Sequence, residues 1–278
     1  MLNFNGKLIA KNEFNLNYSN RAFAYGDAIF DTSKFIDNEV SFLEDHYFRL
    51  MASMRMLRME IPLSFTMPFF ENEILKTIKG ANLKQARVKF TVFRKLGGFY
   101  TPNTNTVDFL IEVNKLNIKE KENYTVDLFK DYKVNSDLLS TIKTNNRIVN
   151  VVSSIYAKEN NLDNSILINQ DKKIVEANNA NIFLIFGNKI ITPPISDGCI
   201  KGIMRKKVIE AIQAKGEFLF EEKSVSPFDL QKADSAFLTN SIIEIQTITN
   251  YKKKKFNPYL VNMVKLSFKE YVDLEKLA

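Results

Sequence analysis

Four short stretches between residues 143 and 205 decide how this chain is interpreted. They read KTNNR at 143–147, IVEANNANIF at 174–183, TPP at 192–194 and GIMR at 202–205. In that order they supply an amine, a carboxylate and a glycine turn that leads into a predicted helix. An amine can form a Schiff base, a carboxylate can keep a pyridine nitrogen protonated, and amides at a helix start can bind phosphate. These groups could hold and activate pyridoxal 5′-phosphate (PLP).

Each of these features also has an ordinary interpretation when it is taken alone. Lys143 and Arg147 could be ordinary exposed charges near a helix start, and Glu176 could be an ordinary charge on an edge strand. Glycine precedes many helices, and the Thr-Asn-Ser stretch at 239–241 fits a turn as well as a phosphate site. The asparagines behind Glu176 are less ordinary, because asparagine is disfavoured in strands. They favour a strand edge that faces a polar ligand.

The composition indicates a globular protein with little room for metal or thiol chemistry. The chain has 278 residues, of which 45% are hydrophobic and 26% charged, enough for one large or two moderate domains. No run of 18 apolar residues and no signal-peptide segment occurs, so we expect a cytoplasmic protein that does not enter a membrane. Cys199 is the single cysteine and His46 the single histidine, so no disulfide and no metal site is expected.

The net charge of +7 does not by itself indicate nucleic acid. The densest basic run, residues 252–255, is lysine throughout. No glycine-rich aromatic motif of an RNA-binding sheet accompanies it, so we interpret it as a solvated loop. Small anionic molecules are an equally good partner for a basic chain.

Periodicity predicts two mixed α and β domains, at 1–113 and 124–278, joined by a charged linker at 114–123. In the first domain we expect a hairpin at 2–9, strands at 29–35, 40–43, 87–94 and 107–113, and helices at 44–59 and 68–78. In the second we expect strands at 124–129, 165–169, 174–177, 181–186 and 234–239, and helices at 146–158, 204–214 and 258–274.

Read together, the motifs resemble the class IV aminotransferases, the fold type IV family of PLP enzymes. The family includes branched-chain and D-amino acid aminotransferases and 4-amino-4-deoxychorismate lyase. The resemblance covers nearly the whole chain. The matching stretches are RAFAYGD at 21–27, Phe30, LEDH at 43–46, Arg49, Lys143, Glu176, NIF at 181–183, TP at 192–193, GIMR at 202–205 and 233–241.

The resemblance implies roles for these positions. Lys143 would carry the cofactor and move the proton, and Glu176 would pair with the pyridine nitrogen. Four groups would hold the phosphate: Arg49, the amides of Ile203 and Met204, and Ser241. Three residues would contact a small anionic amino substrate: Arg94, Arg147 and Phe30. The family also implies two α/β domains, the smaller one N-terminal, with the cofactor between them, and a homodimer.

Local departures from the family pattern bear on the activity. Asp31 stands where aminotransferases commonly have glutamate, Met204 where many have a phosphate-binding threonine, and Ile148 where branched-chain enzymes have tyrosine. The stretches at 143–147 and 202–205, and Asn240, are more similar to aminodeoxychorismate lyases. The resemblance therefore favours a lyase that releases pyruvate and 4-aminobenzoate. A transaminase that needs a 2-oxo acid acceptor is the alternative, and a non-catalytic basic binding protein is a remote one.

Overall fold

The computed structural model describes residues 1–276 and divides into two compact units. The first unit contains residues 1–118 and 142–146, and the second contains residues 119–141 and those from 147 onward. The chain first crosses between units inside the predicted linker. It then returns to the first unit for 142–146, a segment that the sequence analysis had placed in the second domain. That short return brings Lys143 into the first unit.

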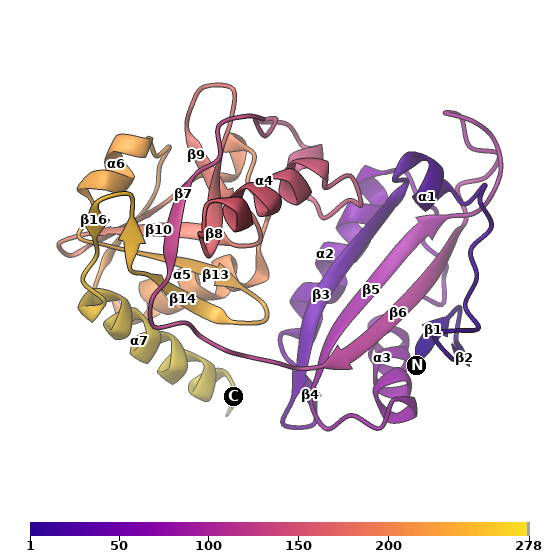
Figure 1. Ribbon diagram of the computed structural model, residues 1–278. Helices are drawn as coiled ribbons and strands as arrows, with labels where there is room; N and C mark the ends of the chain where they lie inside the picture. The colour runs from indigo at the N-terminus through magenta and orange to yellow at the C-terminus, as the bar shows by residue number, and fades with distance from the viewer. Residues whose placement is uncertain (277–278) are drawn as a thin grey trace. The chain divides into compact units, whose positions relative to one another are not determined.

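The first unit is a six-stranded antiparallel sheet in the order β2-β1-β6-β5-β3-β4. Two long helices, α2 and α3, cover one of its faces (Figure 1). The elements are β1 (Leu2–Phe4), β2 (Lys7–Ile9), α1 (Arg21–Tyr25), β3 (Ala28–Ile36), β4 (Glu39–Val40), α2 (Leu43–Met56), α3 (Met67–Gly80), β5 (Ala86–Arg94) and β6 (Val107–Lys115).

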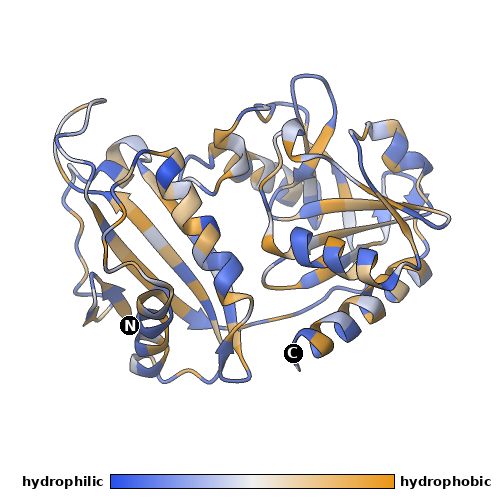
Figure 2. Cartoon of the chain, turned by 180° about the vertical axis from the view of Figure 1, so that it is seen from behind, coloured by the Kyte–Doolittle hydropathy of each residue, from blue (hydrophilic) through white to orange (hydrophobic). Residues whose placement is uncertain are grey.

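Alternation along β5 separates the two faces of this sheet. Val88, Phe90 and Val92 are buried in the core formed with α2 and α3. The residues between them point to the opposite face, because successive side chains of a strand alternate. Lys89 and Thr91 lie there and are only half-buried. Figure 2 shows the same alternation as hydrophobic and hydrophilic segments along the strands.

The second unit contains two five-stranded sheets, ordered β12-β11-β10-β13-β14 and β16-β15-β7-β8-β9. Helices α5 and α7 pack together and against β13, and α4 packs on β8. The strands are β7 (Thr125–Leu128), β8 (Asn164–Ile168), β9 (Ile174–Ala177), β10 (Asn181–Phe186), β11 (Lys189–Thr192), β12 (Leu219–Glu222), β13 (Ser235–Asn240), β14 (Glu244–Ile248), β15 (Asn250–Tyr251) and β16 (Lys254–Lys255). The helices are α4 (Ile148–Glu159), α5 (Ile203–Lys215), α6 (Pro227–Lys232) and α7 (Tyr259–Glu275), with 3-10 turns at Leu139–Thr141 and Ile195–Asp197.

Most predicted elements are confirmed to within a few residues, and the differences have local causes. The strand predicted at 40–43 ends at Val40, because Phe42 takes a left-handed conformation (φ 53°) and Leu43 begins α2. Helix α4 begins at Ile148 rather than 146. Seven helices and strands were not predicted: α1, β11, β12, β14, β15, β16 and α6. Each is six residues or shorter, too short to show a clear period.

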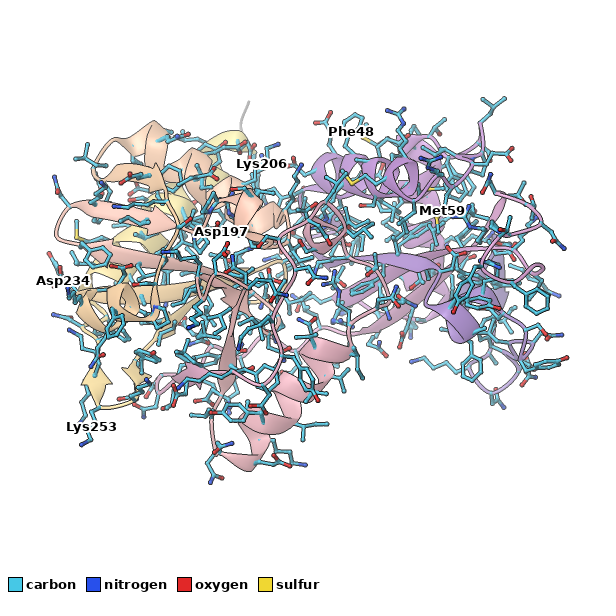
Figure 3. The ribbon with its side chains drawn as sticks, turned by 90° about the horizontal axis from the view of Figure 1, so that it is seen from above. Phe48, Met59, Asp197, Lys206, Asp234 and Lys253 are labelled. Carbon is cyan, nitrogen blue, oxygen red and sulfur yellow. The ribbon has the colours of Figure 1, made fainter. Side chains whose placement is uncertain are left out.

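Two features of the surface can be followed in Figure 3. The lysine run at 252–255 was expected to be a solvated loop, but it forms the turn of the β15–β16 hairpin together with strand β16. Lys252 and Lys253 are exposed at this turn, and Figure 3 labels Lys253. On α2, Phe48 is exposed while Met59, just beyond the helix, is buried (Figure 3). Within residues 1–276, no helix is long and apolar enough to cross a membrane.

Candidate active site

The segment around Lys143 is held on strand β3. The backbone N–H of Phe30 donates to the carbonyl of Lys143 (2.8 Å), and the N–H of Asn145 donates to Ala28 (2.9 Å). A further bridge joins Thr144 to β3. The Lys143 ammonium lies 5.5 Å from the centroid of the Phe30 ring. The structure thus brings together two residues that the sequence had assigned separately to the cofactor and the substrate.

Arg49 is fixed by a buried carboxylate. Its Nε and Nη2 donate to the two oxygens of Asp31 at 2.8 and 2.9 Å, and His46 Nδ1 lies 2.5 Å from the same carboxylate. The side chains of Asp31, His46 and Arg49 are 3%, 1% and 10% exposed. Burial alone would raise the pKa of Asp31, but the charges of Arg49 and His46 and their hydrogen bonds hold it well below its usual value. The aspartate that departs from the family pattern therefore positions Arg49.

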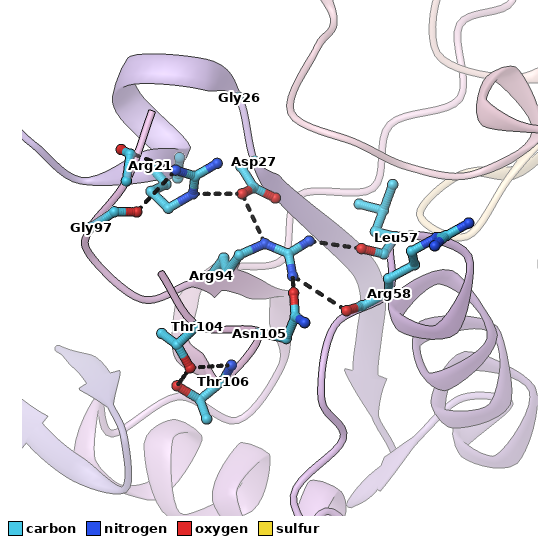
Figure 4. Close-up of polar contacts among 12 residues, drawn as sticks. Arg21, Gly26, Asp27, Leu57, Arg58, Arg94, Gly97, Thr104, Asn105 and Thr106 are labelled. Carbon is cyan, nitrogen blue, oxygen red and sulfur yellow. Dashed lines mark hydrogen bonds and ion pairs between the residues drawn. The ribbon is translucent and has the colours of Figure 1, made fainter. Parts of the chain in front are cut away.

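Arg94 is engaged within the protein. Its Nε donates to Asp27 (3.0 Å), Nη1 to Asn105 and to the carbonyl of Arg58 (3.3 Å), and Nη2 to the carbonyl of Leu57 (2.7 Å) (Figure 4). It is 6% exposed. By alternation along β5 it points to the same side of the sheet as Val92. All three guanidinium nitrogens therefore have protein acceptors. We do not propose Arg94 as a substrate contact.

Glu176 belongs to the second unit, on β9, and is 5% exposed. Its Oε2 accepts a hydrogen bond from the N–H of Ile200 (3.0 Å), and the carbonyl of Ile200 accepts from Asn181 Nδ2 (2.9 Å). Burial lowers the pKa of Arg147, while the negative charge of Glu176 raises it, so the two residues are electrostatic neighbours. Ile200, three residues before α5 begins, thus connects Glu176 to Asn181.

Helix α5 begins at Ile203 and Met204, with Gly202 at its N-cap and no side chain capping it. The first amides of a helix have no intrahelical acceptor, which makes them available to an anion. A Cβ on Gly202 would lie 2.0 Å from Asn181 Oδ1, so glycine is required here by close approach. The importance of Asn181 was not anticipated, although it lies in the NIF stretch that carries the resemblance.

Ser241 lies in the turn that follows β13. The side-chain oxygen of Asn240 accepts from the backbone N–H groups of Ile242 and Ile243 (3.0 and 2.9 Å), and this fixes the turn. Thr239 Oγ1 is buried and has no hydrogen-bond partner within the described residues. Thr239 and Asn181 are directly paired across β13 and β10, so their side chains lie on the same face of the sheet.

Each unit, taken by itself, carries groups of the kind that a phosphorylated pyridine aldehyde requires. The first unit has an amine and an arginine held by a carboxylate. The second has a buried carboxylate, a helix start that no side chain caps and a hydroxyl with no hydrogen-bond partner among residues 1–276. Amine, carboxylate and phosphate-binding groups are the set that such a cofactor requires. Within residues 1–276, no group of three or more His, Cys, Asp or Glu residues could hold a metal ion.

Comparison with known proteins identifies the family. Residues 28–251 match the model of amino-transferase class IV, so the chain belongs to this family of enzymes. It is 26% identical over 254 residues to a D-alanine aminotransferase of Bacillus licheniformis (89% of this chain, 87% of the relative). It is 24% identical over 238 residues to an aminodeoxychorismate lyase of Vibrio harveyi (82% and 84%). The crystal structure of a branched-chain aminotransferase from Thermoproteus uzoniensis with norvaline has the same fold (TM-score 0.87, 20% identity, 97% and 92% covered).

Proposed function

We propose that the protein is a PLP-dependent 4-amino-4-deoxychorismate lyase that releases pyruvate and 4-aminobenzoate. The observation that carries the proposal is the KTNNR stretch at 143–147. The Lys143 ammonium lies 5.5 Å from the centroid of the Phe30 ring, and the stretch ends at Arg147, the electrostatic neighbour of Glu176. This supports the proposal that Lys143 is the reactive amine. The relatives include transaminases and lyases at similar identity, so the family alone does not choose between them.

Each residue has a defined task in this proposal. Lys143 would hold the cofactor through Nζ, and the same amine would take up the proton from the substrate carbon that bears the amino group. Glu176 holds a proton at the pyridine nitrogen. Arg49, the amides of Ile203 and Met204, and Ser241 bind the phosphate. When bound, PLP supplies the aldehyde for the substrate amine and an electron sink.

The lyase reaction then follows from the substrate. The bond between the ring and the enolpyruvyl oxygen breaks, a proton returns to the leaving group to give pyruvate, and the ring becomes aromatic. Aromatisation drives the step, so no amino acceptor is needed. Arg147 and Phe30 are proposed to contact the substrate, whose carboxylates suit a cationic site.

A transaminase is the alternative function, because some relatives of this chain are transaminases. The D-alanine aminotransferase matches 89% of this chain. The branched-chain type is disfavoured by Ile148 at the start of α4, which is 70% exposed and has no hydroxyl where those enzymes place tyrosine.

We also propose that the protein is a homodimer, as the resemblance implies. Sedimentation analysis would test this.

Product formation from freshly generated 4-amino-4-deoxychorismate, with no 2-oxo acid added, tests the proposal. Protein loaded with PLP should release pyruvate and 4-aminobenzoate over many turnovers. The control contains PLP without protein. If loaded protein with a normal visible absorption band gives no product above this control, but transfers an amino group from D-alanine or a branched-chain amino acid to a 2-oxo acid, the lyase assignment is wrong.

A further inference from the structure

Lys89 lies beside the proposed reactive amine, although no motif singled it out. Its ammonium is 4.9 Å from the centroid of the Phe30 ring, and the Lys143 ammonium is 5.5 Å from the same centroid. Two cations therefore share one aromatic ring on the face of the sheet that α2 and α3 leave uncovered. Both lysines and Phe30 belong to the first unit, so this arrangement is a property of one compact body.

The strand register explains why these side chains meet. Phe30 is paired with Thr91, and Thr32 with Lys89, across β3 and β5. The two residues on each strand lie two positions apart, and each is paired directly with one on the other strand, so all four side chains share one face of the sheet. All four are half-buried. The result is a block of one aromatic ring, two hydroxyls and one ammonium beside Lys143.

Lys89 has no carboxylate partner among the described residues, for none lies within 4.0 Å of its ammonium. The acidic residue nearest in the register is Glu112, directly opposite on β6. Glu112 instead accepts from Asn114 (3.0 Å) and lies 3.9 Å from the ammonium of Lys11. A half-buried cation with no ion-pair partner beside a second cation favours an anion on this face.

We infer that Lys89, rather than Arg94, binds a carboxylate of the amine substrate, with the Phe30 ring and the Thr32 and Thr91 hydroxyls around it. The inference rests on the proposed function, because it takes Lys143 as the reactive amine. Alternation on β5 supports it independently. The strand directs Lys89 to the face that carries Lys143 and directs Arg94 to the opposite face, where protein acceptors already surround it.

Three variants test the role of Lys89. Lys89→Met removes the charge and keeps an unbranched side chain of nearly the same length, and Lys89→Arg keeps the charge. Arg87→Met is the matched control, since Arg87 is half-buried on the same face of β5 and its loss changes the net charge equally. Circular dichroism spectra and the visible band of the PLP-loaded protein establish that each variant is folded and loaded.

The first readout is the affinity of the protein without cofactor for benzoate, which is measured by NMR titration at fixed ionic strength. The second is KM and kcat of the loaded enzyme. A charge-assisted hydrogen bond predicts that Lys89→Met weakens benzoate binding and raises KM by about tenfold or more. The effect on kcat should be smaller. Lys89→Arg should stay within about threefold of wild type, and Arg87→Met should match wild type.

Two results would overturn the inference: equal benzoate affinity in Lys89→Met and wild type, or equal losses in Lys89→Met and Arg87→Met. The second result would show a general effect of net charge. Failure of the proposed function looks different, since loaded wild type would then form no product from 4-amino-4-deoxychorismate, or Lys143→Ala would keep the visible band. The benzoate titration without cofactor reports on Lys89 in either case.

Discussion

Replacing Asp31 with asparagine tests whether this carboxylate holds Arg49 in place. Asparagine keeps the shape but removes the charge that faces Arg49 and His46, all three side chains being at least nine-tenths buried. Removing one partner of a buried ion pair typically costs about 3–5 kcal/mol, because an uncompensated charge remains. We therefore expect Asp31→Asn to lower the free energy of unfolding by about 3–5 kcal/mol at pH 7.

The assay is urea unfolding followed by circular dichroism, with hydrogen exchange of β3 and α2 to locate the loss in the first unit. The control is Glu270→Gln, which removes an exposed ion pair with Lys215 and should leave the free energy of unfolding almost unchanged. A loss below about 1 kcal/mol for Asp31→Asn, similar to a surface pair, would refute the reasoning.

The same pair predicts a pH dependence with a definite sign. The folded-state pKa of Asp31 lies below its unfolded value, so its contribution is fully present above pH about 4 and is lost as the pH falls further. The difference in stability between wild type and Asp31→Asn should therefore shrink on acidification below pH about 4. A difference that grows with acid would contradict the assignment.

Three further predictions concern the second unit. Gly202→Ala should clash with Asn181, cost about 1–3 kcal/mol and weaken PLP binding, as measured by fluorescence titration; unchanged affinity would contradict the close approach. Burial raises the pKa of Cys199 to about 12, so its thiol should resist alkylating reagents at pH 8 and react only in urea, which mass spectrometry checks. Glu176→Gln should lower turnover far more than stability, and wild-type activity in this variant would refute its role at the pyridine nitrogen.

The long periodic elements could be predicted because their patterns are strong. In α2, the recurring Leu50, Met51 and Met54 face the sheet, as their helical spacing predicts. The return of residues 142–146 to the first unit could not be predicted, because it depends on backbone pairing with β3 that no side-chain pattern encodes. The same pairing places Lys143 beside Phe30, so the family resemblance, not the periodicity, located this part of the site.

The face of the sheet on which Arg94 lies could have been predicted from the alternation of buried residues along β5. Val88, Phe90 and Val92 mark the buried face of β5, and Arg94 continues their alternation. The same rule directs Lys89 to the other face. The family motif instead favoured Arg94 as a substrate contact, and in the structure protein acceptors surround the guanidinium of Arg94. The contact of Asn181 with Gly202 depends on how β10 meets the start of α5, which a linear sequence does not show.

The most direct test of the account is to locate the covalently bound cofactor. Protein loaded with PLP is reduced with borohydride, digested and mapped by mass spectrometry. The account predicts a phosphopyridoxyl group on Lys143 and none on Lys89, the neighbouring lysine on the Phe30 ring. Modification of Lys89 or of another lysine in place of Lys143 would contradict it.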